Sequence, residues 1–184
     1  MEENKRNACA KQFTAIMNEM IAWYADTTRY VNHFLKVWAF ARQIGLSEGL
    51  SEETQFLLEV TALMHDIGIR PSKEKYGSSA GNYQELEGPG AARPILERHG
   101  FTLAQTERIC YLIGHHHTYQ NMDGLDYQIL VEADFLVNIF EEGQSRKAVE
   151  SVREKIFRTA SGRKLLDTLY LAPSGRIPAA DPDC

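Results

Sequence analysis

A histidine and an aspartate stand side by side at the end of an apolar segment, in the string Leu63-Met64-His65-Asp66-Ile67-Gly68. Neighbouring side chains on a helix diverge in direction, so one of the two must face the core or the helix end. A buried ionised carboxylate is costly unless it is paired or bound to a metal ion. The pair therefore indicates a metal-ligating group or, more simply, an imidazole that ends a helix before an aspartate that starts a turn.

Two further candidates lie inside segments with helical spacing, each in a different part of the chain. Asp134 interrupts an apolar run, in which we expect Glu132 and Asn138 to take the solvent-facing side. His33 lies in a third amphipathic segment. Taken singly, Asp134 can be an exposed carboxylate and His33 can be a structural imidazole with satisfied hydrogen bonds.

Three consecutive histidines, His115, His116 and His117, precede a polar loop in a chain with only six histidines. The spacing from Ile109 to Ile113 places His116 on the same helical face as the apolar residues. We therefore expect His116 to point inward. The alternative is that the three form an exposed polar helix end.

Apolar residues at helical spacing dominate the chain, so helices must carry these candidates. We expect a first helix over about 5–24, a second from Thr27 or Thr28 to Gly45, and a third from Ser51 to near Gly68. A fourth helix is expected to start at Pro89, and a fifth to run from a Thr102–Gln105 capping box towards His117. A sixth should cover about 126–142, and helical sequence should continue to about Tyr170. Residues 69–88, rich in Gly and Ser, are predicted to be the longest irregular stretch. No alternating segment requires a strand, and the predicted class is all-α.

The composition is that of a soluble globular protein, with 184 residues, 43% hydrophobic residues and a formal net charge of -5. We expect one domain over 1–172, with its core motif region at 28–142 and a loose C-terminal tail at 173–184. The negative charge argues against general nucleic-acid binding. Three cysteines without CxxC spacing, and no apolar leader or span, favour a cytoplasmic protein without a membrane segment.

The order His33, then His65-Asp66, then Asp134 resembles that of the HD phosphohydrolase superfamily. The resemblance runs from about His33 to Asn138 and extends to Gly77-Ser78-Ser79-Ala80-Gly81, a string similar to that of a bacterial subgroup. It implies an HD-type helical bundle that hydrolyses phosphate esters. By this resemblance His33, His65, Asp66 and Asp134 are metal ligands, and Asp66 and His116 are catalytic.

Two imidazoles and two carboxylates suit a divalent transition metal such as Mn, Co, Ni, Fe or Zn, or else Mg. The resemblance suggests a second metal or an outer shell at His115 and His116, with Glu85 or Glu87 as a substitute ligand. Relatives with two metals usually have a histidine at the position of Gln84. Because of this departure, we expect one metal rather than two.

The expected substrate is a small phosphorylated molecule, most simply a nucleotide. Cations and hydroxyls that follow the His65-Asp66 pair are candidates to hold its phosphate: Arg70, Lys73, Lys75, Ser78 and Ser79. No GxxxxGK[ST], GxGxxG or HExxH motif offers another chemistry.

Two other functions stay open. One is a di-iron oxygenase of the same fold, against which Gln84 counts. The other is a nucleotide-binding module without turnover, which would have no need of an intact ligand set. The first and last helices can also supply the face of a homodimer.

Overall fold

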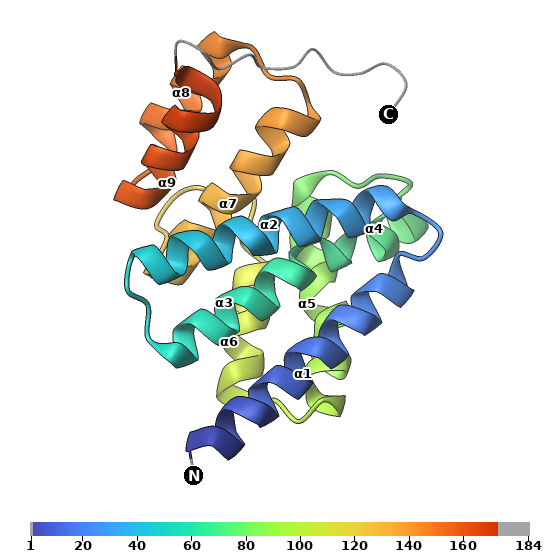
Figure 1. The fold of residues 1–184 in the computed structure, drawn as a ribbon. Helices are drawn as coiled ribbons and strands as arrows, with labels where there is room; N and C mark the ends of the chain where they lie inside the picture. Colours follow the sequence, from blue (N-terminus) through green and yellow to red (C-terminus); the bar gives the residue numbers. More distant parts are fainter. Residues whose placement is uncertain (1, 173–184) are drawn as a thin grey trace.

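The structure is a computed structural model that describes residues 2–172, and over that range it is all-helical (Figure 1). Its elements are α1 (Glu2–Trp23), α2 (Thr28–Ser47), α3 (Glu52–Met64), η1 (His65–Gly68), α4 (Ile69–Tyr76), α5 (Gly81–Arg98), α6 (Leu103–Ile113), α7 (Leu125–Glu141), α8 (Arg146–Lys155), α9 (Ala160–Leu166) and η2 (Asp167–Leu171). Within the described residues there is no strand, as predicted. The expected loose tail, 173–184, lies outside the described residues.

Helix α3 lies at the centre and packs against α1, α2, α6 and α7 (Figure 1). Its residues Leu58 and Ala62 join a core cluster with α2, α7 and α9, whereas Val60, Leu63 and Met64 join a second cluster with α1, α5 and α6. From Leu57 to Met64 every residue of α3 is buried. The C-terminal end of α3 therefore delivers His65 into the middle of the molecule.

Two of the predicted helix caps are present, whereas Thr27 precedes α2 without a capping hydrogen bond from its side chain. The Ser51 side chain accepts a hydrogen bond from the Thr54 amide, and Thr102 and Gln105 form the expected capping box. The expected stop at Gly45 is wrong, because α2 continues to Ser47. Gly45 is instead a point of close packing, where a Cβ atom would lie 2.2 Å from Gln55 Oε1.

The expectation that residues 69–88 are irregular is also wrong. Helix α4 follows η1 directly, and α5 begins at Gly81, so that Pro89 and Pro94 both lie inside α5. Gly77 ends α4 in the left-handed conformation, whereas Gly68 and Gly88 serve close packing. A Cβ on Gly68 would meet the Gln84 carbonyl oxygen at 2.4 Å, and one on Gly88 would meet Ile113 Cγ2 at 2.6 Å. Close packing of α5 on η1 and α6 outweighs the weak helix propensity of these residues.

The predicted solvent-facing position of Glu132 is wrong as well. Its side chain is fully buried and accepts hydrogen bonds from the backbone amides of Arg158 and Thr159, at 2.6 and 2.9 Å. Glu132 therefore ties the segment between α8 and α9 to α7. Buried donors of this kind supply the polar partners that a buried carboxylate needs.

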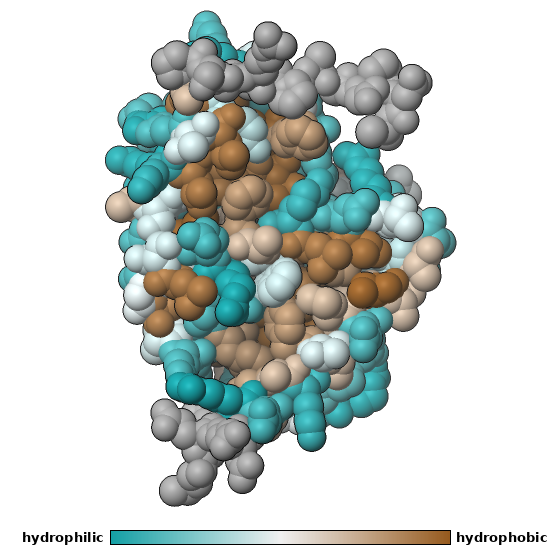
Figure 2. Space-filling model, in the orientation of Figure 1, coloured by the Kyte–Doolittle hydropathy of each residue, from teal (hydrophilic) through white to brown (hydrophobic). Residues whose placement is uncertain are grey.

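Apolar side chains reach the surface on the face drawn in Figure 2, between α7 and α9 and where α2 passes α1. Exposed large apolar residues of the described chain include Ile21 and Leu169, which belong to the first helix and to the last helical segment. A homodimer through these helices stays a prediction. Over residues 2–172, none of the helices has the length and apolar character needed to cross a membrane.

Candidate metal centre

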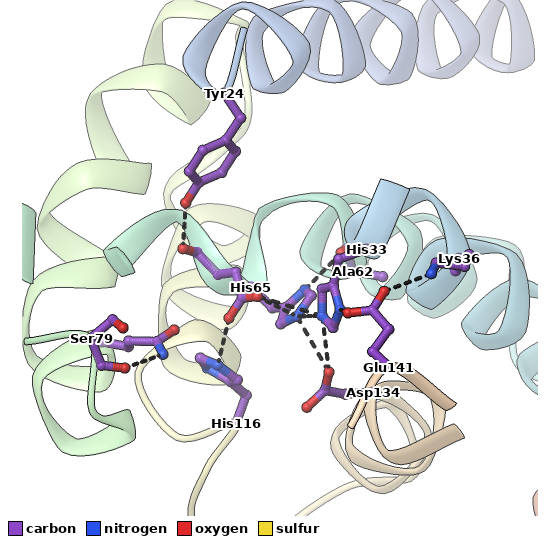
Figure 3. Close-up of polar contacts among 11 residues, drawn as sticks. Tyr24, His33, Lys36, Ala62, His65, Ser79, His116, Asp134 and Glu141 are labelled. Carbon is purple, nitrogen blue, oxygen red and sulfur yellow. Dashed lines mark hydrogen bonds and ion pairs between the residues drawn. The ribbon is translucent and has the colours of Figure 1, made fainter. Parts of the chain in front are cut away.

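Donor side chains from α2, η1 and α7 converge in the interior (Figure 3). His33 Nε2 lies 3.3 Å from His65 Nε2 and 3.2 Å from Asp134 Oδ1. Asp66 Oδ2 lies 3.5 Å from the Nε2 atoms of His33 and His65. His65 Nε2 lies 3.7 Å from Asp134 Oδ1. The structure thus brings together all four residues that the sequence proposes as ligands.

These separations suit one divalent ion. Ligand atoms that lie about 2.0–2.2 Å from an ion are about 3.0–3.5 Å from their neighbours in its coordination shell. Donor atoms of His33, His65 and Asp66 all lie within 4.8 Å of one another, and Asp134 adds a second carboxylate beside both imidazoles. The mixed imidazole and carboxylate set is that of transition-metal sites.

The imidazoles are turned so that their Nε2 atoms face the cluster. His65 Nδ1 lies 2.9 Å from the Ala62 carbonyl oxygen, an acceptor, so this nitrogen carries the proton. His33 Nδ1 likewise faces a carboxylate oxygen of Glu141 at 3.1 Å. When neutral, both rings therefore present a lone pair at Nε2, as a metal ligand must.

Without a metal, protons balance the charges of the cluster. Burial alone would lower the pKa of His33, but hydrogen bonds to Asp134 and Glu141 and the charge of Asp66 raise it to about 10. Burial alone would raise the pKa of Asp66 and Asp134, yet the neighbouring imidazoles hold the pKa of both carboxyl groups well below the usual range. Protons and a cation thus compete for the same atoms.

A second group of donors shares Asp66 and comprises Asp66, His116 and His117. His116 is 1% exposed, which confirms its predicted inward direction, and its Nε2 lies 3.6 Å from Asp66 Oδ1. The Nε2 atoms of His116 and His117 are buried without a hydrogen-bond partner. Burial, together with the charge of His116, lowers the pKa of His117 to about 4. A neutral, unpartnered imidazole is suited to bind a cation.

A family model of the HD domain matches residues 30–160, which contain all of these donors. The chain belongs to the HD domain family. The helical bundle described above is thus an HD fold, as the sequence predicts. No curated protein and no solved structure matches the chain.

Three residues predicted for a second metal or an outer shell lie outside both donor groups: His115, Glu85 and Glu87. His115 Nδ1 faces the Tyr111 carbonyl oxygen at 2.7 Å, and its ring stacks on Tyr111. Glu85 accepts a hydrogen bond from the His117 amide at 2.9 Å, whereas Glu87 pairs with Lys75. Within the described chain, the structure therefore places His117 rather than His115 beside Asp66, with Glu85 as a support for the turn.

The three predicted phosphate-binding cations each have a partner within the protein. Arg70 binds Asp26 and the Trp23 carbonyl oxygen, and Lys73 donates to the Tyr30 hydroxyl at 2.8 Å. Tyr30 lies one turn before His33 on α2. Of the partners of the three cations, Tyr30 is therefore the closest in sequence to a donor residue.

The two serines that follow α4 make local contacts instead. Ser78 Oγ accepts from the Ala80 amide at 3.2 Å, and the Ser79 carbonyl oxygen accepts from Gln84 Nε2 at 2.8 Å. The buried Gln84 thus holds the segment between α4 and α5. Whether the two hydroxyls touch a substrate stays a prediction.

Sequence reasoning missed two residues that contact the metal donors, Glu141 and Tyr24. For Glu141 the sequence contained a signal. Glu141 follows Asp134 by seven residues on α7, which places both side chains on one helical face. Tyr24 had no such signal, because it lies on the chain before the HD match and reaches the turn η1 only through tertiary packing.

The Tyr24 hydroxyl donates to the Asp66 carbonyl oxygen at 2.6 Å and is buried (Figure 3). Tyr24→Phe removes this bond, so we expect a loss of about 1–2 kcal/mol in the free energy of unfolding. We also expect weaker metal binding, because the bond supports the turn that carries two donors. Denaturant unfolding and metal titration measure the two effects.

Tyr170→Phe is the matched control, because the Tyr170 hydroxyl donates to the Leu136 carbonyl oxygen, also at 2.6 Å. It should lower stability to a similar extent and leave metal affinity unchanged. Equal metal affinity in both variants would mean that Tyr24 does not support the site.

The stability of the metal-free HD domain should fall as the pH rises from 6.5 to about 10. His33 has a pKa raised from 6.5 to about 10, so its contribution is complete below 6.5 and is lost as the pH passes through about 10. Asp66 and Asp134, with pKa values lowered from 3.8, contribute fully above pH 3.8 and lose that contribution only as the pH falls below it, outside this range. Thermal unfolding of EDTA-treated protein across this range measures the effect. His33→Gln should flatten the slope, and an unchanged slope would refute this assignment.

Proposed function

We propose that this HD domain is a metal-dependent phosphohydrolase that holds a divalent transition metal ion through His33, His65, Asp66 and Asp134. The observation that carries the proposal is the convergence of two imidazole Nε2 atoms and two carboxylates at separations of 3.2–3.7 Å. When bound, such an ion lowers the pKa of a water molecule and neutralises charge on phosphoryl oxygens. We expect one tightly bound ion per chain, because the second donor group has three members and shares Asp66.

Two side chains are proposed to act in proton transfer. The Asp66 carboxylate can accept a hydrogen bond from the attacking water and orient it. His116 Nδ1 faces the Ile113 carbonyl oxygen at 2.7 Å, and the Asp66 carboxylate raises the pKa of His116 against the effect of burial. His116 can therefore hold a proton on Nε2 and donate it to the oxygen of the leaving group.

The proposed substrate is a phosphate ester of a nucleotide or a related small molecule. We propose Lys73 as the first phosphate contact to test, because its partner Tyr30 belongs to the same helix as His33. The Lys73 ammonium group can leave the neutral Tyr30 hydroxyl and bind an anionic phosphate oxygen instead. The hydrogen bond to the anionic oxygen is the stronger one. Arg70, Lys75, Ser78 and Ser79 stay as candidates for wider phosphate contacts.

The test is hydrolysis of chromogenic phosphate mono- and diesters, and then of a nucleotide panel, by EDTA-treated protein supplied with Mn, Co, Ni, Mg or Fe(II). Turnover that requires an added metal supports the proposal. Oxygen uptake with Fe(II) in place of hydrolysis would favour the oxygenase. Tight nucleotide binding with no turnover under any metal would favour a silent binding module.

A further inference from the structure

The two ring nitrogens of His33 have different partners, and only one faces the donor cluster. Nε2 lies 3.2 Å from Asp134 Oδ1, whereas Nδ1 lies 3.1 Å from Glu141 Oε2 (Figure 3). A carboxylate is an acceptor only, so a neutral His33 in this contact carries its proton on Nδ1. The contact thus leaves the Nε2 lone pair directed at the cluster.

Glu141 is itself held in place by Lys36. Lys36 Nζ donates to Glu141 Oε1 at 2.6 Å, so the two oxygens of the carboxylate serve two different partners. The Glu141 side chain is 13% exposed. Lys36 follows His33 by three residues on α2, so both side chains come from one turn of that helix. Both bind the Glu141 carboxylate at the end of α7.

The other inward imidazoles use backbone acceptors at the same position. His65 Nδ1 faces the Ala62 carbonyl oxygen and His116 Nδ1 faces the Ile113 carbonyl oxygen, each three residues earlier in the chain. Among these three rings, only His33 has a charged acceptor at Nδ1, and that acceptor comes from a different helix. An anionic partner raises the basicity of a ring more than a carbonyl group does.

We propose that Glu141, fixed by Lys36, is a positioning residue that sets the tautomer and direction of His33 and thereby strengthens His33 Nε2 as a metal ligand. This inference rests on the proposed metal site. A partner of this kind typically contributes 10- to 100-fold to metal affinity. Glutamine in place of Glu141 keeps the size but offers both a donor and an acceptor, so it permits either tautomer.

The test is Co²⁺ titration of the full chain, monitored by calorimetry and by the visible absorption of the bound ion. Glu141→Gln should bind Co²⁺ roughly 10- to 100-fold more weakly, with an altered spectrum, whereas Glu141→Asp should recover most of the affinity. Glu142→Gln is the matched control: Glu142 is the neighbouring exposed acid, and it should behave as the wild type.

Wild-type affinity and spectrum in Glu141→Gln would overturn the inference and leave the metal site intact. No Co²⁺ binding by the wild type would instead refute the proposed function. If Glu141→Gln fails to fold, Lys36→Met decides the question. Weaker binding by Lys36→Met than by Glu142→Gln supports the inference, and equal binding overturns it.

Discussion

Replacement of Asp66 by alanine should abolish both metal binding and hydrolysis. Asp66 is common to the two donor groups, so its loss removes a carboxylate from each. We expect activity to fall by about 10³-fold or more, beyond the 10- to 100-fold typical of residues that only support a ligand. Metal content after dialysis and turnover with saturating Mn²⁺ measure the two losses on the same sample.

Glu74→Ala is a suitable control, since Glu74 is an exposed acid on α4 and lies outside both donor groups. It should keep its metal and its activity. An Asp66→Ala protein that still retains stoichiometric metal would show that the ion binds elsewhere. A folded variant that keeps its metal but loses turnover would restrict Asp66 to the orientation of water.

Replacement of Glu132 by alanine should cause the largest loss of stability among the changes considered. Its carboxylate accepts from Gln128 Nε2, from the amides of Arg158 and Thr159, and from the Thr159 hydroxyl. Removal leaves several buried donors without an acceptor, at about 1–3 kcal/mol for each one that water cannot reach. We expect a total of about 3–4 kcal/mol and a fall in Tm on the order of 10 °C.

Glu132→Gln keeps one acceptor oxygen and should cost markedly less than Glu132→Ala. Calorimetric unfolding of both variants measures the difference. Similar melting temperatures for wild type and Glu132→Ala would show that the segment between α8 and α9 does not depend on this carboxylate.

Much of the fold follows from local signals in the sequence. The Ser51 cap and the Thr102–Gln105 capping box are decided by side chains within three residues of the helix start, and both are present. The inward direction of His116 follows from helical spacing in the same way. Signals of this range need no knowledge of distant contacts.

The errors arise where distant packing decides. Gly68 and Gly88 suggest a loop by composition, yet they allow α5 to approach η1 and α6 closely. The charge of Glu132 suggests a solvent-facing side, yet its carboxylate accepts hydrogen bonds from backbone amides 26 and 27 residues later. Neither outcome can be predicted from helical spacing alone.

In the candidate site, the donor residues could be predicted from the sequence, but the contacts that orient them could not. The resemblance of the order His33, His65-Asp66 and Asp134 to the HD family predicts which donors meet, and the structure brings them together. Glu141 reaches His33 from α7, and Tyr24 reaches Asp66 from the turn after α1, so both contacts depend on how distant segments pack. The roles of these donors as metal ligands stay a prediction.

A crystal of the full chain soaked in Mn²⁺ tests the central claim most directly, through anomalous scattering collected with and without EDTA. We predict a peak in contact with His33 Nε2, His65 Nε2, and carboxylate oxygens of Asp66 and Asp134, and its loss on treatment with EDTA. A cluster that binds no Mn²⁺ at saturating concentration, or a peak only at other residues, would contradict the assignment of this HD domain as a metal-dependent phosphohydrolase.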